Sequence, residues 1–225
     1  MLAGCLVLLA LILLVGRQAF DLSIMQALQG AGNPMLYRVM VAVSWLGWQP
    51  QVTLLSVPLV LLFFARGLIP ESAAALLALL LGSPVYLLLA ILGDRPRPHV
   101  VVEGLPVYRE LTGTSFPSGH VINYVLFCGF LAYLTYTQVR HPAVRRALLV
   151  PTLGLIALVG PSRIYLGQHW PSDVLASYLI GGVLLLALVA LYRRAKRRQL
   201  ALAALLEGTL ARSQGAGEGG DGHRQ

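Results

Sequence analysis

An arginine, a histidine and an aspartate stand together near the end of an otherwise apolar stretch. Residues 160–182 read GPSRIYLGQHWPSDVLASYLIGG, which places Arg163, His169 and Asp173 between two long apolar runs. Ionisable groups in or beside a bilayer are costly to bury, so their presence there indicates a functional site. Asp173 follows His169 by four residues across the start of a predicted helix. It can therefore hydrogen-bond one ring nitrogen of His169 and leave the other free to attack.

A second histidine follows the predicted start of another helix. In SFPSGH (115–120), Ser118 and Gly119 fall where the helix begins, and His120 comes next. The free backbone amides and positive dipole end of a helix N-terminus favour an anion, and glycine allows the anion to approach closely. His120 can protonate a leaving oxygen as a general acid.

Arginines complete this set of residues. Arg95 and Arg97 lie in GDRPRP (93–98), and Arg163 lies beside the first histidine. Their forked donors match phosphate oxygens. An anion cradle, a nucleophile with an orienting carboxylate and an acid together predict phosphoryl transfer through a phosphohistidine. Because the arginines supply the positive charge, the pattern predicts neither a metal nor a cofactor.

The composition places these residues in a membrane protein. The 225-residue chain is 57% hydrophobic and 12% charged, whereas a soluble domain carries about 25% charged residues. The apolar runs predict an all-α integral membrane protein built as a six-transmembrane-helix bundle. Two further short helices, broken at Gly32–Pro34, are expected at the membrane interface over residues 20–48. The predicted spans are 1–16, 50–65, 72–92, 118–139, 147–161 and 174–192.

The positive charge indicates how the bundle is oriented. The net charge is +8, and cations cluster at 140–146 and 193–198, each just after an apolar run. This is the pattern of cytoplasmic loops, and no aromatic and basic surface for nucleic acid accompanies it. We therefore expect a multi-pass protein of the cell membrane with both termini in the cytoplasm. The polar segments 93–117 and 162–173 then share the outer face.

The chain divides into three parts by composition. Residues 1–192 form the predicted membrane domain, with its core at 50–192. Residues 193–211 are basic and are expected to be a partly helical cytoplasmic segment. The Gly-rich, polar residues 212–225 predict a disordered tail.

The polar segments resemble the signature of the type 2 phosphatidic acid phosphatase family, also called the lipid phosphate phosphatases. That signature is a lysine six residues before Arg-Pro, then Pro-Ser-Gly-His, then Ser-Arg with five residues to His and three more to Asp. The second and third parts match in full, and the resemblance covers roughly residues 20–192. The matching residues are Pro117, Ser118, Gly119, His120, Ser162, Arg163, His169 and Asp173.

The resemblance implies a role for each matching residue. His169 would be the nucleophile, Asp173 its partner and His120 the general acid. The family fold is a six-helix membrane bundle with an acid-phosphatase-like active site at one membrane face. The residues expected to bind phosphate are Arg97, Ser118, Gly119 and Arg163, with Arg95 and Ser162 as further candidates.

One position departs from the signature. The family lysine would fall at position 90, where this chain has Ala90, while Arg97 and Pro98 stand in place. The cradle then has one cation fewer. We expect Arg95 to take over the contact that the lysine would make.

Three functions are compatible with these residues. The first is a metal-independent lipid phosphatase that cleaves a phosphomonoester or diphosphate at the outer leaflet. Undecaprenyl diphosphate, phosphatidic acid and phosphatidylglycerophosphate are the candidate substrates. The second is a phosphotransferase that passes the same phosphoryl group to an acceptor lipid. The third is a catalytically weak lipid-phosphate-binding protein without the family lysine, which the intact His120, His169 and Asp173 disfavour.

Overall fold

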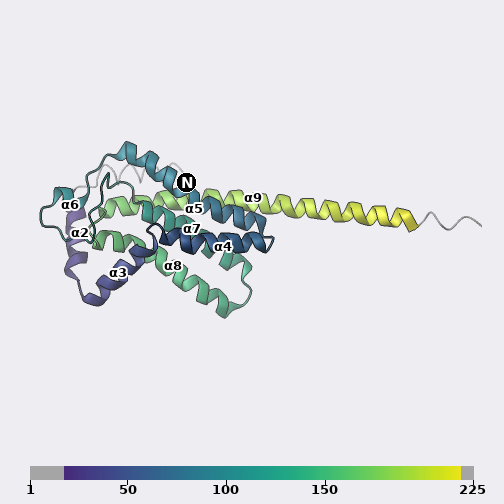
Figure 1. Ribbon diagram of the computed structural model, residues 1–225, viewed down its shortest axis with the longest axis horizontal. Helices are drawn as coiled ribbons and strands as arrows, with labels where there is room; N and C mark the ends of the chain where they lie inside the picture. The colour runs from purple at the N-terminus through teal and green to yellow at the C-terminus, as the bar shows by residue number, and fades with distance from the viewer. Residues whose placement is uncertain (1–17, 219–225) are drawn as a thin grey trace, which may run out of the picture.

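The computed structural model describes residues 18–218, with side chains from 20 to 209, and every regular element in this range is a helix (Figure 1). The two short helices predicted around Gly32–Pro34 are confirmed as α2 and α3. The helices are α2 (Gln18–Gly30), α3 (Pro34–Leu46), α4 (Gln51–Ala65), α5 (Ile69–Gly93), α6 (Pro98–Val101), α7 (Gly119–Gln138), α8 (Pro142–Tyr165) and α9 (Pro171–Glu218).

Four or five membrane spans lie within the described residues. Four segments are long and apolar enough to cross a bilayer: Ile69–Val101, Gly119–Gln138, Pro142–Tyr165 and Pro171–Thr209. Helices α3 and α4 pass the same test only as a pair bent by 56°, and so form a fifth span or a re-entrant segment. The predicted first span, 1–16, lies outside the described residues. The described residues therefore show an all-helical membrane protein with four or five candidate spans, and six spans are not shown.

Helix α7 lies at the centre of the bundle and packs against α5, α8 and α9. Its side chains Ile122, Leu126 and Phe130, one helical turn apart, are fully buried. Helices in a bilayer associate through close packing and small residues at their contacts. Gly181 of α9 shows this closeness, because a Cβ there would lie 2.9 Å from the Cβ of Val125. Helix α9 therefore packs closely on α7 near the end where the sequence motifs lie.

The end of α8 and the start of α9 are shaped by a short, tight turn. Gly167 follows α8 in the left-handed conformation, at φ 70°, as is common just after a helix. Its amide donates to the Ile164 carbonyl at 3.0 Å, and a Cβ there would lie 2.5 Å from the Pro106 carbonyl oxygen. Pro171 then opens α9, a position that suits proline. This turn brings residues 162–173 against the loop that contains Pro106.

Helix α9 runs further than the sequence predicted. It continues without a break from Pro171 through the basic segment to Glu218, and Figure 1 shows it projecting well beyond the bundle. Residues 212–218, where we expected disorder, are thus helical, and 219–225 lie outside the described residues. The cause is local composition, because residues 194–207 consist mainly of Ala, Leu, Arg, Lys, Gln and Glu, which favour helix.

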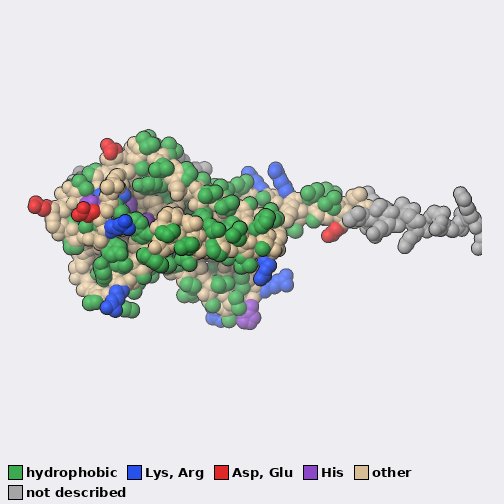
Figure 2. Space-filling view, in the orientation of Figure 1, with side chains coloured by type: hydrophobic (Ala, Val, Ile, Leu, Met, Phe, Trp, Pro, Cys, Tyr) green, Lys and Arg blue, Asp and Glu red, His purple; other side chains and the backbone are tan. Residues whose placement is uncertain are grey.

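The basic clusters lie at the end of the bundle opposite α6. Figure 2 shows Lys and Arg side chains around the start of α8 and on α9 where that helix leaves the bundle. These are the clusters at 140–146 and 193–198. The motif segments are at the other end, beside α6 and α2 (Figure 1).

Candidate active site

The three motif segments meet at one end of the bundle. The amide of Ser115 donates to the Arg95 carbonyl at 2.7 Å, which ties the first segment to the second. The amide of Ser118 donates to Ser177 Oγ of α9 at 2.7 Å. The side chains brought together here are buried: Arg97, Ser118, Arg163, His169 and Asp173.

His169 is held by a backbone carbonyl. Its Nδ1 lies 2.7 Å from the Ser115 carbonyl oxygen. Since a carbonyl can only accept, Nδ1–H donates, and Nε2 of the neutral ring carries the free lone pair. The pKa of His169 is held well below 6.5, first because the ring is buried and then because the guanidinium groups of Arg163 and Arg97 lie close by. The ring is thus a neutral imidazole with one nitrogen fixed and the other available.

Asp173 does not orient His169 directly, in contrast to the expectation from its spacing. Its carboxylate accepts from Ser115 Oγ at 2.5 Å and from Arg95 Nη1 at 2.6 Å. It also accepts from the Trp170 amide at 3.3 Å, so the third residue of α9 reaches back to cap the helix start. Asp173 therefore fixes Ser115, and the carbonyl of Ser115 fixes His169.

Several buried donors of the motif residues have no partner among residues 18–218. They are Ser118 Oγ, and Nε and Nη2 of Arg163, and His120 Nε2 is likewise unpaired. Arg163 is fully buried, and its Nη1 donates to Ser44 Oγ of α3 at 2.5 Å. Buried polar groups are almost always hydrogen-bonded, and the exceptions call for an explanation. Unpaired donors on the motif residues at one site are what an oxyanion-binding cradle requires.

The indole ring of Trp48, between α3 and α4, covers this site. The His120 ring packs edge-on against it, with 5.2 Å between ring centroids. The guanidinium carbons of Arg163 and Arg109 lie 5.7 and 4.8 Å from the indole centroid. Cations over an aromatic face are attracted by the ring quadrupole. Trp48 thus contacts both the buried Arg163 and the exposed Arg109.

Arg97 and Gly119 occupy positions compatible with the predicted cradle. Arg97 is buried, and loop carbonyls fix its guanidinium: Nε donates to Gly113 at 3.2 Å and Nη1 to Gln168 at 2.9 Å. Gly119 opens α7, and a Cβ there would already touch the Tyr86 ring at 3.4 Å. Gly119 therefore stands at the helix start that the sequence predicted, and Arg97 is buried at the same end of the bundle.

Arg95 and Ser162 are directed elsewhere. Arg95 Nη2 pairs with Asp21 at 2.6 Å and Nη1 pairs with Asp173 at 2.6 Å, so both terminal nitrogens are engaged by carboxylates. This corrects the expectation that Arg95 replaces the missing lysine in the cradle. Ser162 Oγ donates to the Val159 carbonyl of its own helix at 2.7 Å, as serine commonly does inside a helix. Ala90 lies half-buried in α5.

Asp21 is a residue of this site that sequence reasoning missed. It lies in α2, is almost fully buried, and accepts from Arg95 and from both the amide and the hydroxyl of Ser172. A lone carboxylate in the mostly apolar FDLSIMQAL was the available signal. The backbone carbonyl of Ser115 carried no such signal, because every residue has one.

The sequence profile of the PAP2 superfamily matches residues 71–197, more than half of the chain. The chain belongs to the PAP2 superfamily. It is 29% identical over 189 residues to phosphatidylglycerophosphatase B of Bacillus subtilis (strain 168), covering 80% of this chain and 87% of that protein.

Two solved structures share the PAP2 fold seen here. The first is the crystal structure of a transmembrane PAP2-type phosphatidylglycerolphosphate phosphatase from Bacillus subtilis, with a TM-score of 0.69 and 20% identity. The superposition covers 85% of this chain and 96% of that one. The second is LpxE of Aquifex aeolicus, with a TM-score of 0.60, 22% identity, and 75% and 94% coverage. This chain therefore shares its fold with both structures.

Proposed function

We propose that this PAP2 protein is a metal-independent lipid phosphatase that works through a phosphohistidine on Nε2 of His169. The observation that carries this proposal is the buried site in which Nδ1 of His169 is fixed while the donors of Ser118 and Arg163 are unpaired. A nucleophile with one nitrogen tied, facing donors that have no acceptor, is suited to a tetrahedral anion.

The reaction would take two steps. Nε2 of His169 attacks phosphorus, the N–P bond forms, and the bond from phosphorus to the lipid or phosphate oxygen breaks. His120 gives its proton to that leaving oxygen. Water then attacks the phosphohistidine, His120 takes a proton from it, and inorganic phosphate leaves as the N–P bond breaks. Arg97, Arg163, Ser118 and the Gly119 amide stabilise the charge on the phosphoryl oxygens in both steps.

The substrate class rests on the relatives and on the site together. The similar Bacillus subtilis protein is a phosphatidylglycerophosphatase by name, which supports a lipid phosphomonoester. Phosphatidic acid and undecaprenyl diphosphate present the same terminal phosphate. The test is phosphate release from a panel of these lipids by purified protein in detergent containing EDTA. We expect release from at least one lipid, and no release from any lipid would contradict the proposal.

We further propose six spans, both termini in the cytoplasm and the active site at the outer face of the cell membrane. The basic clusters at 140–146 and 193–198 lie at the end opposite the motifs, which supports this orientation. A cysteine placed at Gly104 should react with an impermeant thiol reagent in intact cells. One placed at Ala143 should not, and the reverse pattern would overturn the orientation.

A further inference from the structure

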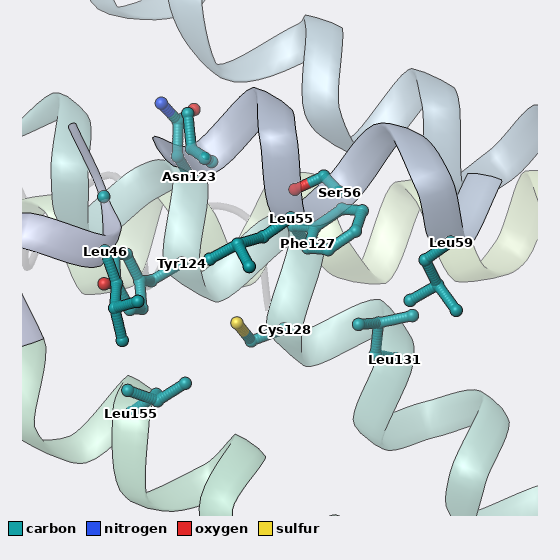
Figure 3. A pocket seen from close by; sticks show the side chains of 12 residues that line it. Leu46, Leu55, Ser56, Leu59, Asn123, Tyr124, Phe127, Cys128, Leu131 and Leu155 are labelled. Atoms are coloured by element: carbon teal, nitrogen blue, oxygen red, sulfur yellow. The ribbon is translucent and has the colours of Figure 1, made fainter. Parts of the chain in front are cut away.

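The two histidines of the site have different surroundings. Beside His120 lies an apolar cavity of about 220 Å³, lined in part by Leu55, Phe127 and Leu155 (Figure 3). Gly47 also lines this cavity, and a Cβ on Gly47 would lie 2.7 Å from Cδ2 of His120. His169, in contrast, is fixed by the Ser115 carbonyl, which belongs to a continuous set of polar contacts. These contacts begin in α2, outside the three motif segments.

Helix α2 brings one carboxylate to these contacts, that of Asp21. The helix packs on α8 and α9, and its Met25 is fully buried. Further along α2, Gln29 donates to the carbonyls of Pro106 and Tyr165 at 2.9 and 3.0 Å. Asp21 itself is almost fully buried in the first turn. Because α2 is held against the bundle beyond Asp21, the fold sets the position of this carboxylate.

Both oxygens of Asp21 accept hydrogen bonds from other elements. Oδ1 accepts from the Ser172 amide at the start of α9 at 2.9 Å. Oδ2 accepts from Ser172 Oγ and from Arg95 Nη2, each at 2.6 Å. The Ser172 hydroxyl in turn accepts from Arg95 Nη1 at 2.7 Å, since a hydroxyl can donate one bond and accept others. Asp21 thus meets the requirement that a buried carboxylate be paired and hydrogen-bonded.

The contact with Asp21 decides how Arg95 meets Asp173. A guanidinium and a carboxylate commonly form a two-bond fork, in which both carboxylate oxygens accept from the same arginine. Here Nη2 of Arg95 is bound to Asp21, and Asp173 accepts from Nη1 through Oδ1 at 2.6 Å. The other oxygen, Oδ2 of Asp173, accepts from Ser115 Oγ at 2.5 Å and from the Trp170 amide at 3.3 Å. Asp21 therefore leaves Oδ2 of Asp173 available to Ser115.

Ser115 transmits this arrangement to the nucleophile. Its hydroxyl is held by Asp173, its amide donates to the Arg95 carbonyl at 2.7 Å, and its own carbonyl accepts from Nδ1 of His169 at 2.7 Å. With Nδ1–H donating, Nε2 carries the lone pair of the neutral ring. If Arg95 bound both oxygens of Asp173, the Ser115 hydroxyl would lose its acceptor. The carbonyl that fixes His169 would then lose one of its two anchors.

We propose that Asp21 is a positioning residue, a role that rests on the proposed phosphatase function and deepens it. By binding Nη2 of Arg95, Asp21 restricts Asp173 to a single contact with that arginine, and Ser115 and His169 keep the geometry needed for attack. The PAP2 profile matches residues 71–197, so Asp21 lies outside the matched region. Helix α2 is thereby a fourth segment of the active site.

The first test separates kcat from KM. Asp21→Ala frees Nη2 of Arg95, so Asp173 can form the fork and the support of His169 is weakened. We expect kcat to fall about 10-fold, the size of losing one charge-assisted hydrogen bond. KM should stay within about twofold, because Asp21 contacts Arg95 and Ser172 rather than the cradle.

The matched control is Glu103→Gln, at an exposed carboxylate in the loop after α6, which should behave as the wild type. If Asp21→Ala does not fold, Asp21→Asn serves the same comparison, since it keeps the size of the side chain but not its charge. A lower Tm with wild-type kcat would make Asp21 structural only and would overturn the inference. A raised KM with unchanged kcat would place Asp21 in phosphate binding and would overturn it as well.

The second test asks whether Asp21 acts through Arg95. Mutations within one hydrogen-bond network are not additive. We therefore expect kcat of the Asp21→Ala, Arg95→Ala double mutant to lie within about twofold of Arg95→Ala alone. If the two losses multiply, Asp21 acts by another route, and the inference fails.

The third test needs no substrate. In protein labelled with ¹⁵N-histidine, the ring nitrogen shifts of His169, assigned by their absence from His169→Ala, show which nitrogen carries the proton. At a pH where the ring is neutral, the wild type and Glu103→Gln should show the proton on Nδ1, and Asp21→Ala should show a mixture of both tautomers. A mixture in Asp21→Ala, with no phosphate release from any lipid by the wild type, would support the positioning role and contradict the proposed function. Lipid phosphate hydrolysis by the wild type, with an unchanged tautomer in Asp21→Ala, would contradict the positioning role alone.

Discussion

The two ends of this bundle both bury carboxylates against cations, but the contacts around those carboxylates differ. At the basic end, one oxygen of Glu71 collects contacts from Lys196, Tyr192 and Gln138, which ties α5, α7 and α9 together. At the motif end, Asp173 and Asp21 engage Arg95, while the donors of Arg163 and Ser118 are left unpaired. The other oxygen of Glu71, Oε2, is a buried acceptor without a partner among the described residues, whereas the unpaired groups of Arg163 and Ser118 are donors. Buried donors without a partner cost stability unless a ligand accepts from them. The motif end is thus suited to an anion, and the Glu71 cluster is not.

The largest loss of activity at the motif end should come from removing the buried guanidinium of Arg163. Loss of a preorganised donor to a developing oxyanion costs about 10²–10³-fold in rate. We expect Arg163→Ala to lower kcat/KM for lipid phosphate hydrolysis by that amount. Arg66→Ala, at an exposed arginine after α4, is the matched control and should behave as the wild type. A wild-type rate in Arg163→Ala would mean that the unpaired donors do not bind the phosphoryl group.

A smaller loss of activity is expected from Arg95→Ala. The double mutant with Ala90→Lys distinguishes an Arg95 that pairs with carboxylates from an Arg95 that binds the phosphate. The structure places Arg95 between Asp21 and Asp173, so Arg95→Ala should leave two carboxylates without their cation and loosen Ser115 and His169. We expect kcat/KM to fall about 10–100-fold, the size of losing one or two charge-assisted hydrogen bonds. Because Arg95 is not in the cradle, Ala90→Lys should not restore activity in the double mutant. Partial rescue by the lysine would show instead that Arg95 contacts the phosphate in the wild type.

The pH dependence should report the burial of His169. Its folded pKa is depressed well below 6.5, so the neutral, nucleophilic ring persists as the pH falls through 6.5. The acid limb of kcat/KM that belongs to His169 should therefore lie below pH 6.5. The unfolded chain takes up a proton at this histidine near pH 6.5 and the folded chain does not, so this group makes stability decrease as the pH falls below that value. An acid limb assigned to His169 above pH 6.5 would contradict the described environment.

The smallest effect on activity is expected at the basic end. Glu71→Gln removes the charge that pairs with Lys196, which is about one-third exposed, while it keeps an acceptor for Tyr192. We expect the free energy of unfolding to fall by ~1–2 kcal/mol, visible as a lower Tm, with kcat/KM for lipid phosphate hydrolysis within about twofold of the wild type. A strong loss of kcat/KM without a change in Tm would mean that this end also takes part in the chemistry.

The sequence predicted most of the helices because their signals are local. Apolar length marks α5, α7, α8 and the first part of α9, and Gly32–Pro34 marks the break between α2 and α3. The sequence predicts the end of α9 too early, because the cation cluster is typical of the end of a span although its residues favour helix. Helix boundaries thus followed from composition only where a helix has a breaker at its end.

The sequence predicted which residues belong to the site better than it predicted the hydrogen bonds between them. Residue types and spacing identified His120, Arg163 and His169, which the structure brings to one end of the bundle. The contacts of Asp173 were not predictable from a spacing of four residues, because its carboxylate is drawn to the helix start, to Ser115 and to Arg95. Such partners come from segments far apart in sequence, and Asp21 reaches this cluster from α2.

The measurement that tests the central claim most directly is trapping of the phosphorylated protein. Wild-type protein would be quenched during turnover of a radiolabelled lipid phosphate, and acid-labile label on the protein would be mapped to a peptide. We expect the label on His169, its absence from His169→Ala, and a fall in turnover of about 10⁴-fold or more in that variant. His141→Ala, an exposed histidine at the opposite end, should trap and turn over like the wild type. Wild-type rates in His169→Ala, or label on another residue, would contradict the account.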